Sequence, residues 1–333
     1  MINEFIKYTK DEDCLHVFLI NNPFTGIISR MIIDAYQIKE CNVFSVSTRN
    51  TDTSLVSKAP FILKMNFLDR LQIKFFRQSP QASRLLRRIS KKNKKFFLYT
   101  AWAYEETIRT SDGVRVTNSH PSVQKLLKSD LCMGHAYIEE GQLTHRQTKI
   151  YPPEDRQRLH DEYIMRLNGQ FRDDEHRLKN RLYYRNDAHV FIGAVEGAFP
   201  NAPKDKRIIL NNYNALKGHY DPLLLGTKMI GLTCAERRLS IEQWQPMLEK
   251  LINQMPNGGV IKLHPSFITN VEKNRRIKNI FNKIAPSNID FCEDETIIEM
   301  EMLYEPKRLI GSRTSLKKYA EAFGSEFIDV KLY

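Results

Sequence analysis

The feature that most constrains the fold is the regular alternation of short apolar runs with longer amphipathic segments. The apolar runs are rich in valine, isoleucine, leucine and phenylalanine, and they stand at residues 15–21, 42–47, 96–101, 135–139, 190–194, 207–210, 229–233, 260–263, 289–292 and 308–310. Helix-like segments lie between many of them, such as 240–255, which begins at a capping residue, Ser240, and 271–284. This alternation is typical of parallel sheets with helices on both faces, so it predicts an α/β protein.

The length of 333 residues is enough for two domains with separate cores. The pattern changes from about Pro152 to Asn186, where charged residues are dense and β-branched residues are rare. We therefore predict an N-terminal domain over residues 1–150, a helical linker over 151–187 and a C-terminal domain over 188–333. Both domains are expected to be doubly wound and Rossmann-like and to face a central cleft, with ligands outside the carboxyl ends of the strands.

The composition, 41% hydrophobic and 27% charged, is that of a globular protein, and no apolar run approaches the roughly 20 residues of a membrane-spanning helix. The first residues lack the basic-then-apolar pattern of a secretory signal. The five cysteines are scattered, and no pair has metal-ligand spacing. These observations predict a cytoplasmic protein with reduced thiols.

The net charge of +12 favours an anionic partner, which is a nucleic acid, an acidic membrane or a nucleotide-linked substrate. The segment from Arg84 to Lys95 holds seven cations and no acid, and an amphipathic stretch with Phe67, Leu71, Phe75 and Phe76 precedes it. This pattern predicts peripheral attachment to an anionic inner-membrane face; the alternative is a solvated helix and loop. The cations are not interleaved with aromatic residues in a nucleic-acid motif, so no nucleic acid is expected as a partner.

A pair of acids before a glycine, Glu139-Glu140-Gly141, ends the strand-like run at 135–139. Adjacent strand residues point to opposite faces, so at most one of the two carboxylates can face a given ligand. Gly141 allows a sharp turn of the backbone. A carboxylate at this position can accept the proton of an attacking hydroxyl; the alternative is an exposed acidic turn.

The second candidate is His264-Pro265 at the end of the run 260–263. A residue before proline is pushed to extended geometry, so His264 is expected at a rigid strand exit. There it can bind a phosphate or protonate a departing one. Lys262, two residues earlier on the same strand face, adds positive charge. The alternative is a purely structural histidine.

The third candidate is a cluster of hydroxyls at the start of a helix, with Ser312, Thr314 and Ser315 around Arg313. Hydroxyls and free backbone N–H groups at such a position form an anion site; the alternative, compatible reading is an N-cap.

Two weaker candidates follow strands. Asn21 and Asn22 stand after the first strand, where residues 22–26 are predicted as a turn and a helix is expected near 27–35. Thr233 ends the run 229–233. Both are candidates by position, because each should reach the carboxyl edge of its sheet.

The three motifs, in this order and at strand ends, resemble those of the bacterial sialyltransferases and polysialyltransferases, which carry a Glu/Asp-Glu/Asp-Gly motif, a His-Pro motif and a Ser/Thr-rich motif. The resemblance rests on about a dozen residues in the last two thirds of the chain. It implies a GT-B fold and an inverting transfer of sialic acid from CMP-sialic acid to a sugar hydroxyl, such as that of galactose. The acceptor would be a bacterial surface glycan: lipopolysaccharide, O-antigen or capsule.

The resemblance also implies roles for particular residues. Glu140 matches the catalytic base, with Glu139 in a supporting or structural role, while Thr314 and Ser315 match the hydroxyl pair that holds the donor phosphate together with His264.

No obvious Asp-x-Asp metal motif of a nucleotide-sugar enzyme appears in the sequence. We therefore predict a reaction without metal or cofactor, which suits a donor with a single phosphate. The nearest alternative is transfer of another CMP-activated acid sugar, such as Kdo, and a basic nucleic-acid-binding protein is the alternative from another class. The acceptor, free or lipid-linked, the linkage, the length of the product and the oligomeric state stay open.

Overall fold

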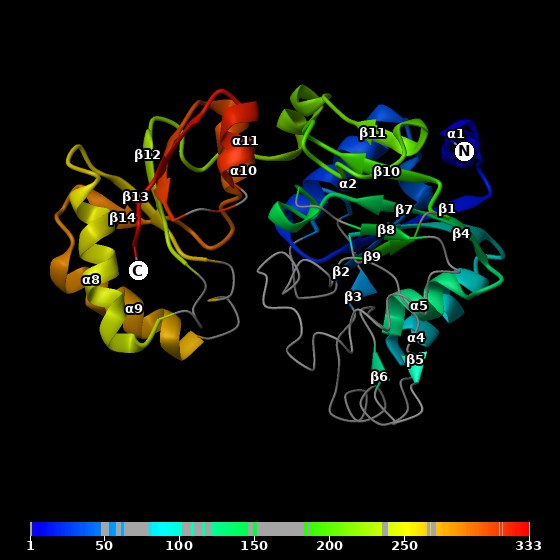
Figure 1. The fold of residues 1–333 in the computed structure, drawn as a ribbon, viewed down its shortest axis with the longest axis horizontal. Helices are drawn as coiled ribbons and strands as arrows, with labels where there is room; N and C mark the ends of the chain where they lie inside the picture. The colour runs from blue at the N-terminus through cyan, green and yellow to red at the C-terminus, as the bar shows by residue number, and fades with distance from the viewer. Residues whose placement is uncertain are drawn as a thin grey trace. The chain divides into compact units, whose positions relative to one another are not determined.

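The computed structural model divides into two compact units, Met1–Ala215 and Leu216–Tyr333 (Figure 1). It describes residues 2–47, 53–57, 61–62, 80–101, 108–109, 115–116, 121–145, 149–151, 183–185, 187–234, 239–264, 267, 271–312, 314 and 316–332. Most of the predicted linker, residues 152–182, lies outside the described residues, as do Phe67, Leu71, Phe75 and Phe76 of the predicted amphipathic stretch.

The first unit is built on a seven-stranded sheet in which all paired neighbours are parallel. Its strands, in their order across the sheet, are β11 (Arg207–Ile209), β10 (Val190–Gly193), β7 (Cys132–Ile138), β4 (Lys95–Thr100), β1 (Cys14–Ile20), β2 (Val43–Ser47) and β3 (Phe61–Ile62). The chain runs outward from β1 to β3 and then returns to β4 on the other side of β1. The topological switch point, where open α/β sheets bind ligands, therefore lies between β1 and β4.

Helices cover both faces of this sheet. Alternate strand residues point to opposite faces, and β1 is buried at every position, so both faces must be covered. The helices are α1 (Ile2–Lys10), α2 (Pro23–Ala35), α4 (Pro80–Ser90) and α5 (Pro121–Leu127). Leu85 of α4 and Val123 of α5 are buried with Leu98 of β4 on one face. On the other face, the ring of Phe5 in α1 packs against those of Phe97 and Tyr99 in β4.

Helix α2 begins four residues earlier than the sequence predicts, so the predicted turn over 22–26 lies largely inside it. Asn22 is the N-cap: its side-chain oxygen accepts the N–H of Thr25 at 2.8 Å, and the Thr25 hydroxyl accepts the N–H of Asn22 at 3.2 Å. Pro23 at the first helical position needs no hydrogen-bond partner for its nitrogen. Asn-Pro thus starts the helix here.

Two small two-stranded sheets also belong to the first unit. They pair β5 (Ile108–Arg109) with β6 (Arg115–Val116), and β8 (Lys149–Tyr151) with β9 (Tyr183–Arg185).

The second unit has a five-stranded parallel sheet. Its strands, in their order across the sheet, are β14 (Ile289–Phe291), β13 (Gly259–Lys262), β12 (Met229–Leu232), β15 (Arg308–Gly311) and β16 (Glu326–Asp329). In Figure 1, helices α8 (Ile241–Asn253) and α9 (Val271–Ile284) lie on one side of this sheet, and α10 (Ile298–Tyr304) and α11 (Leu316–Ala322) lie on the other. Here the switch point lies between β12 and β15.

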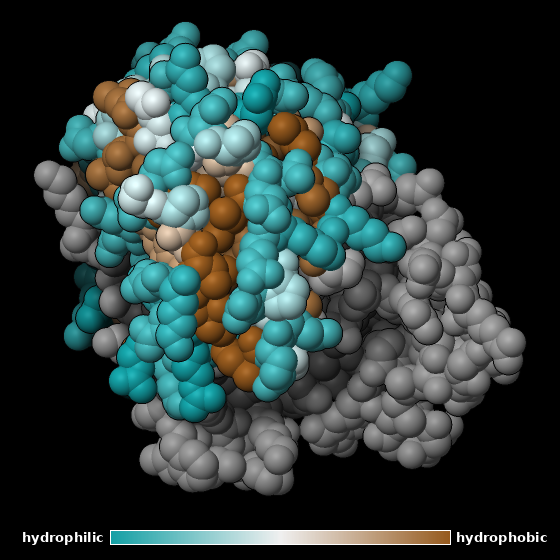
Figure 2. Space-filling model, turned by 90° about the vertical axis from the view of Figure 1, so that its left-hand side faces the viewer, coloured by the Kyte–Doolittle hydropathy of each residue, from teal (hydrophilic) through white to brown (hydrophobic). Residues whose placement is uncertain are grey.

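The core of the second unit lies between the sheet and its helices and includes Trp244, Leu248 and Ile261. Partly buried apolar residues, among them Ile252 and Ile280, pack against this core. Figure 2, which views the molecule from the left-hand side of Figure 1, shows a strip of hydrophobic residues bordered by hydrophilic ones. Ile252 and Ile280 themselves are only partly buried, so the border of this core remains in contact with solvent.

The structure corrects one predicted boundary. The sequence prediction places residues 188–215 in the C-terminal domain, whereas β10 pairs with β7 and β11 pairs with β10 in the first sheet. The physical reason is that β10 is a fully buried apolar strand, and it lies inside the first sheet between β7 and β11. The first unit accordingly extends to Ala215.

None of the helices in the described part of the chain has the length and apolarity that a bilayer span requires.

Candidate functional site

Glu140 lies at the carboxyl edge of the first sheet, two residues after Ile138, the last residue of β7. Asn21 directly follows β1, and β4 alone separates these two strands in the sheet. The side-chain amide of Asn21 donates to Oε1 of Glu140 at 2.8 Å, and that of Asn22 donates to the backbone oxygen of Glu140 at 3.0 Å. The structure thus brings three sequence-predicted residues together beside the switch point.

The contacts of Glu140 hold a partly exposed carboxylate in place. Its backbone N–H donates to the Thr144 hydroxyl at 3.0 Å. The Thr25 hydroxyl lies 3.1 Å from Oδ1 of Asn21, which leaves the amide nitrogen of Asn21 to face Glu140. Gly141 has a φ of 130°, which L side chains rarely adopt, so the turn after Glu140 requires glycine. A carboxylate held in this way is suited to accept a proton.

Glu139 has the opposite environment, because its side chain is fully buried. Its Oε2 accepts the backbone N–H of Ala194 at 2.7 Å, and its Oε1 contacts Nε2 of His145. Sequence reasoning did not single out Thr144, His145 or Ala194. His145 lies four residues after Gly141 in the sequence, but no motif distinguishes it from the other histidines.

The second group of candidates lies at the carboxyl edge of the second sheet. Thr233, His264 and Ser312 follow β12, β13 and β15, which are neighbours in that sheet. The backbone N–H of His264 donates to the Thr233 hydroxyl at 2.9 Å, so these two candidates are in direct contact. The residue His264 is exposed. An imidazole at this edge is accessible to a ligand.

The hydroxyl cluster near α11 is partly described. The Ser312 hydroxyl donates to the backbone oxygen of Val330 at 3.2 Å, and the Thr314 hydroxyl accepts the N–H of Leu316 at 3.3 Å. Thr314 therefore holds the first residue of α11, and the N-cap stays a prediction. Ser315 and Pro265 lie outside the described residues.

Lys262 is engaged with the turn that follows β14. Its ammonium donates to the backbone oxygens of Glu293 and Asp294 at 2.7 and 2.8 Å. Burial lowers the pKa of Lys262 from its ordinary value. These contacts tie the ends of β13 and β14 together, and a role for Lys262 in phosphate binding remains a prediction.

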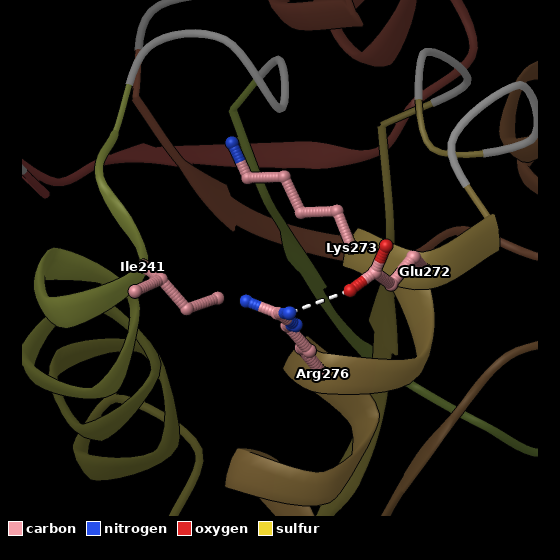
Figure 3. Close-up of a pocket in the computed structure, with 4 residues that line it drawn as sticks. All are labelled: Ile241, Glu272, Lys273 and Arg276. Atoms are coloured by element: carbon pink, nitrogen blue, oxygen red, sulfur yellow. Dashed lines mark hydrogen bonds and ion pairs between the residues drawn. The ribbon is translucent and has the colours of Figure 1, made fainter.

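A cavity of about 400 Å³ lies where α8 and α9 begin (Figure 3). It is lined by Ile241, Glu272, Lys273 and Arg276. Arg276 pairs with Glu272 at 2.5 Å, and Lys273 donates to the backbone oxygen of Leu239 at 3.3 Å. Since its charged side chains are engaged with one another or with the backbone, and none is a sequence-predicted site residue, we do not place the chemistry here.

Among the described residues, no three histidine, cysteine, aspartate or glutamate side chains gather in a way that could hold a metal ion. The expectation of a metal-independent reaction remains a prediction.

No protein-family model and no curated protein matches this sequence. Solved structures do resemble it in fold. S. aureus MnaA, in a co-structure with UDP, matches with a TM-score of 0.53 and 11% sequence identity, covering 95% of this chain and 79% of that one.

Two further structures match with lower TM-scores. UDP-GlcNAc 2-epimerase from Neisseria meningitidis, bound to UDP-GlcNAc, has a TM-score of 0.46 at 14% identity, covering 96% of this chain and 82% of that one. The GT-B domain of a sialyltransferase from Photobacterium damselae has a TM-score of 0.46 at 12% identity, covering 95% and 90%.

At these identities the likeness concerns the fold. Two parallel α/β sheets, each with its own switch point, and the similarity to MnaA over nearly the whole chain define a two-domain, Rossmann-like fold of the GT-B type. The predicted fold class, an α/β protein with two Rossmann-like domains of the GT-B type, is confirmed.

Proposed function

We propose that this protein is an inverting glycosyltransferase that moves sialic acid from CMP-sialic acid to a sugar hydroxyl, such as that of galactose, on a bacterial surface glycan. The acceptor oxygen attacks the anomeric carbon of the donor, and the bond from that carbon to the phosphate oxygen breaks. Glu140 takes the hydroxyl proton, and CMP departs. No metal or cofactor takes part in this scheme.

The observation that carries the proposal is the placement of Glu140. It stands at the carboxyl edge of the first sheet, beside the switch point, and Asn21 holds its carboxylate at 2.8 Å. A general base must lie where a substrate hydroxyl can reach it. The partial exposure of Glu140 meets this requirement, and the complete burial of Glu139 does not.

The donor phosphate is assigned to the second unit. His264 is exposed at the end of β13, and Thr314 follows β15 two strands away in the same sheet. With Ser315 they supply an imidazole and two hydroxyls for the phosphate. The positively charged form of His264 would stabilise the departing CMP.

One alternative keeps the same chemistry, with another CMP-activated acid sugar such as Kdo as the donor. A second alternative is a UDP-sugar enzyme, which the UDP in the similar S. aureus structure suggests. The alternatives differ in the nucleotide, or in the sugar that it carries.

Thermal unfolding with CMP, CDP, UDP and single-stranded RNA separates the nucleotide classes. A ligand at 100 times its dissociation constant stabilises the folded state by about 2.7 kcal/mol. We expect stabilisation by CMP and not by UDP or RNA. Stabilisation by UDP alone would support the UDP-sugar enzyme, and stabilisation by RNA alone would support a nucleic-acid-binding protein.

The activity itself is tested with labelled acceptor sugars and CMP-Neu5Ac, followed by linkage analysis of the product. Transfer to a galactoside is the expected result. Transfer from CMP-Kdo but not from CMP-Neu5Ac would replace the donor in this proposal. No transfer from either donor to any acceptor, free or lipid-linked, would overturn it.

A further inference from the structure

We propose that Glu139 and His145 form a buried pair whose role is to position the turn that carries Glu140. This inference rests on the proposed function, in which Glu140 is the base. It gives the two acids of the motif separate tasks: Glu140 reacts, and Glu139 fixes the backbone from which Glu140 projects.

The pair is closed to solvent. The side chain of Glu139 is 0% exposed, and that of His145 is 1% exposed. A buried carboxylate is strongly unfavourable unless its oxygens are hydrogen-bonded. Here Ala194 donates to one oxygen at 2.7 Å, and the His145 ring contacts the other. Glu139 is therefore fixed from two sides.

The pair is coupled to Glu140 through one short segment. His145 is the last residue of the 3-10 helix Gln142–His145, which follows Gly141. Thr144, next to His145, accepts the backbone N–H of Glu140 at 3.0 Å with its hydroxyl, and its own N–H donates to the Gly141 oxygen at 2.9 Å. A displacement of His145 would therefore displace the hydrogen-bond partner of the Glu140 backbone.

The neighbouring strand is adapted to this arrangement. Gly193 ends β10 directly before Ala194, and a Cβ atom there would lie 3.2 Å from Oε2 of Glu139 and would collide with Ala198. Glycine at this place avoids the collision with Ala198 and leaves the carboxylate of Glu139 in close contact with the strand. The contact between Glu139 and the end of β10 is thus a tightly packed one.

Positioning of this kind affects turnover because proton transfer requires close approach of base and hydroxyl. A misplacement of about 1 Å can lower a rate by about 10²-fold. We therefore expect His145→Ala to reduce kcat by about 10²-fold while the affinity for CMP, which is assigned to the other unit, stays unchanged. His145→Gln keeps an N–H donor for Glu139 and should restore most of the activity.

A double-mutant cycle with Glu140→Gln distinguishes positioning from a general loss of structure. If His145 acts through Glu140, His145→Ala will add little to the loss already caused by Glu140→Gln. The matched control is His16→Gln, which removes another buried histidine of the same unit, near the start of β1, and should leave kcat unchanged.

Thr144→Val offers a second test if His145→Ala does not fold. It removes the acceptor for the Glu140 N–H without leaving Glu139 unpaired, and we expect a loss of about 10-fold or more in kcat. Unchanged kcat in the His145→Ala and Thr144→Val variants, or losses that multiply in the Glu140→Gln background, would overturn the inference. Unchanged turnover of Glu140→Gln itself would instead overturn the assignment of the base.

Discussion

Glu139 and Glu140 are adjacent in the chain, yet their carboxylates have opposite surroundings. One is fully buried and held by Ala194 and His145, and the other is partly exposed and held by Asn21. The alternation of side chains at the end of a strand accounts for this difference. Residue type alone therefore does not distinguish the two acids, whereas exposure and hydrogen-bond partners do.

Glu140→Gln keeps the shape of the side chain and removes the proton acceptor. We expect turnover to fall by about 10² or more, with CMP binding nearly intact. Steady-state kinetics with the labelled donor and calorimetry with CMP measure the two effects. If Glu140→Gln keeps its turnover while Glu139→Gln is inactive, the assignment within the pair is wrong.

His264→Ala and the double change Thr314→Ala/Ser315→Ala should weaken the binding of CMP. Each removes hydrogen bonds to a charged phosphate, worth about 1.5–3 kcal/mol, which corresponds to about 10- to 100-fold in Kd. Calorimetry with CMP measures this directly. Lys283→Ala, an exposed change in α9, serves as the control. Unchanged affinity in both site variants, with intact folds, would rule out this phosphate site.

His16 makes the stability of the first unit dependent on pH. Burial lowers its pKa from 6.5 to about 4. Between these values the unfolded state binds a proton that the folded state does not, so stability falls as the pH falls, by up to about 3 kcal/mol. The free energy of unfolding of His16→Gln should change less over this range, as denaturant titrations at neutral pH and near pH 4 will show. Equal pH dependence in both proteins would contradict the expectation.

The secondary structure elements show which parts of a fold a sequence predicts well. Helix α9 lies at the predicted residues 271–284, and α8 has the predicted cap, Ser240, because capping and apolar periodicity are local properties. The strand β16 was not predicted, since its residues, Glu326–Asp329, are partly or fully exposed and lack a clear apolar run. Local patterns thus predict buried elements better than peripheral ones.

The residues of the candidate site likewise include some that the sequence predicts and some that it does not. Glu139, Glu140 and Asn21 are predictable because residues at the ends of parallel strands share one edge. Ala194 is not, because its contact with Glu139 depends on the packing of β10 beside β7, and the two residues are 55 apart in the chain. No sequence motif encodes that distance in space. His145 lies close to Glu139 in the chain, but its contact depends on the 3-10 helix Gln142–His145, which no motif marks.

Membrane attachment remains a prediction, and the exposed cations of helix α4 allow a test of it. Its Leu85 and Ile89 are buried, whereas Arg84, Arg87 and Arg88 are exposed. Each such cation contributes about 1 kcal/mol near an anionic bilayer. We expect co-sedimentation with vesicles that contain phosphatidylglycerol, release at about 1 M salt, where the Debye length is about 3 Å, and no binding to neutral phosphatidylcholine vesicles.

The matched variants for this experiment change charge equally at two places. Arg84→Glu/Arg87→Glu/Arg88→Glu should abolish sedimentation. The control, Lys250→Glu/Lys283→Glu/Lys317→Glu, alters exposed lysines of the second unit and should retain it. Failure of the unaltered protein to bind anionic vesicles at low salt would mean that the basic run is only a solvated surface.

At the level of the entire chain, the change in charge density near residue 152 indicated a division but not its position. The sheet of the first unit continues through β10 and β11, and the division by contacts falls after Ala215. Composition reports how a segment interacts with water, whereas a domain boundary depends on which strands pair. For this reason the number of domains was easier to predict than their limits.

The activity of the whole protein should survive excess EDTA. The one Asp-x-Asp triplet of the sequence, Asp11-Glu12-Asp13, directly precedes β1 and so lies at the edge of the sheet opposite to Glu140. A donor with one phosphate also needs less neutralisation than a diphosphate. Transfer assays with and without chelator measure this. Complete loss of activity, restored by Mn²⁺, would indicate a metal-dependent nucleotide-sugar enzyme.

The strand order has a consequence for how the chain acquires its function. Neighbouring strands of both large sheets are parallel, so the chain connects consecutive strands by crossovers and not by tight hairpins. Asn21 and Glu140 are 119 residues apart in the chain. Contacts between such distant segments form slowly, because long loops must close before the contacts are made. Helices such as α8 and α9 can form early, whereas the surroundings of Glu140 are complete only when the first sheet is assembled. The candidate site is therefore among the last parts of a newly synthesised chain to take its final form.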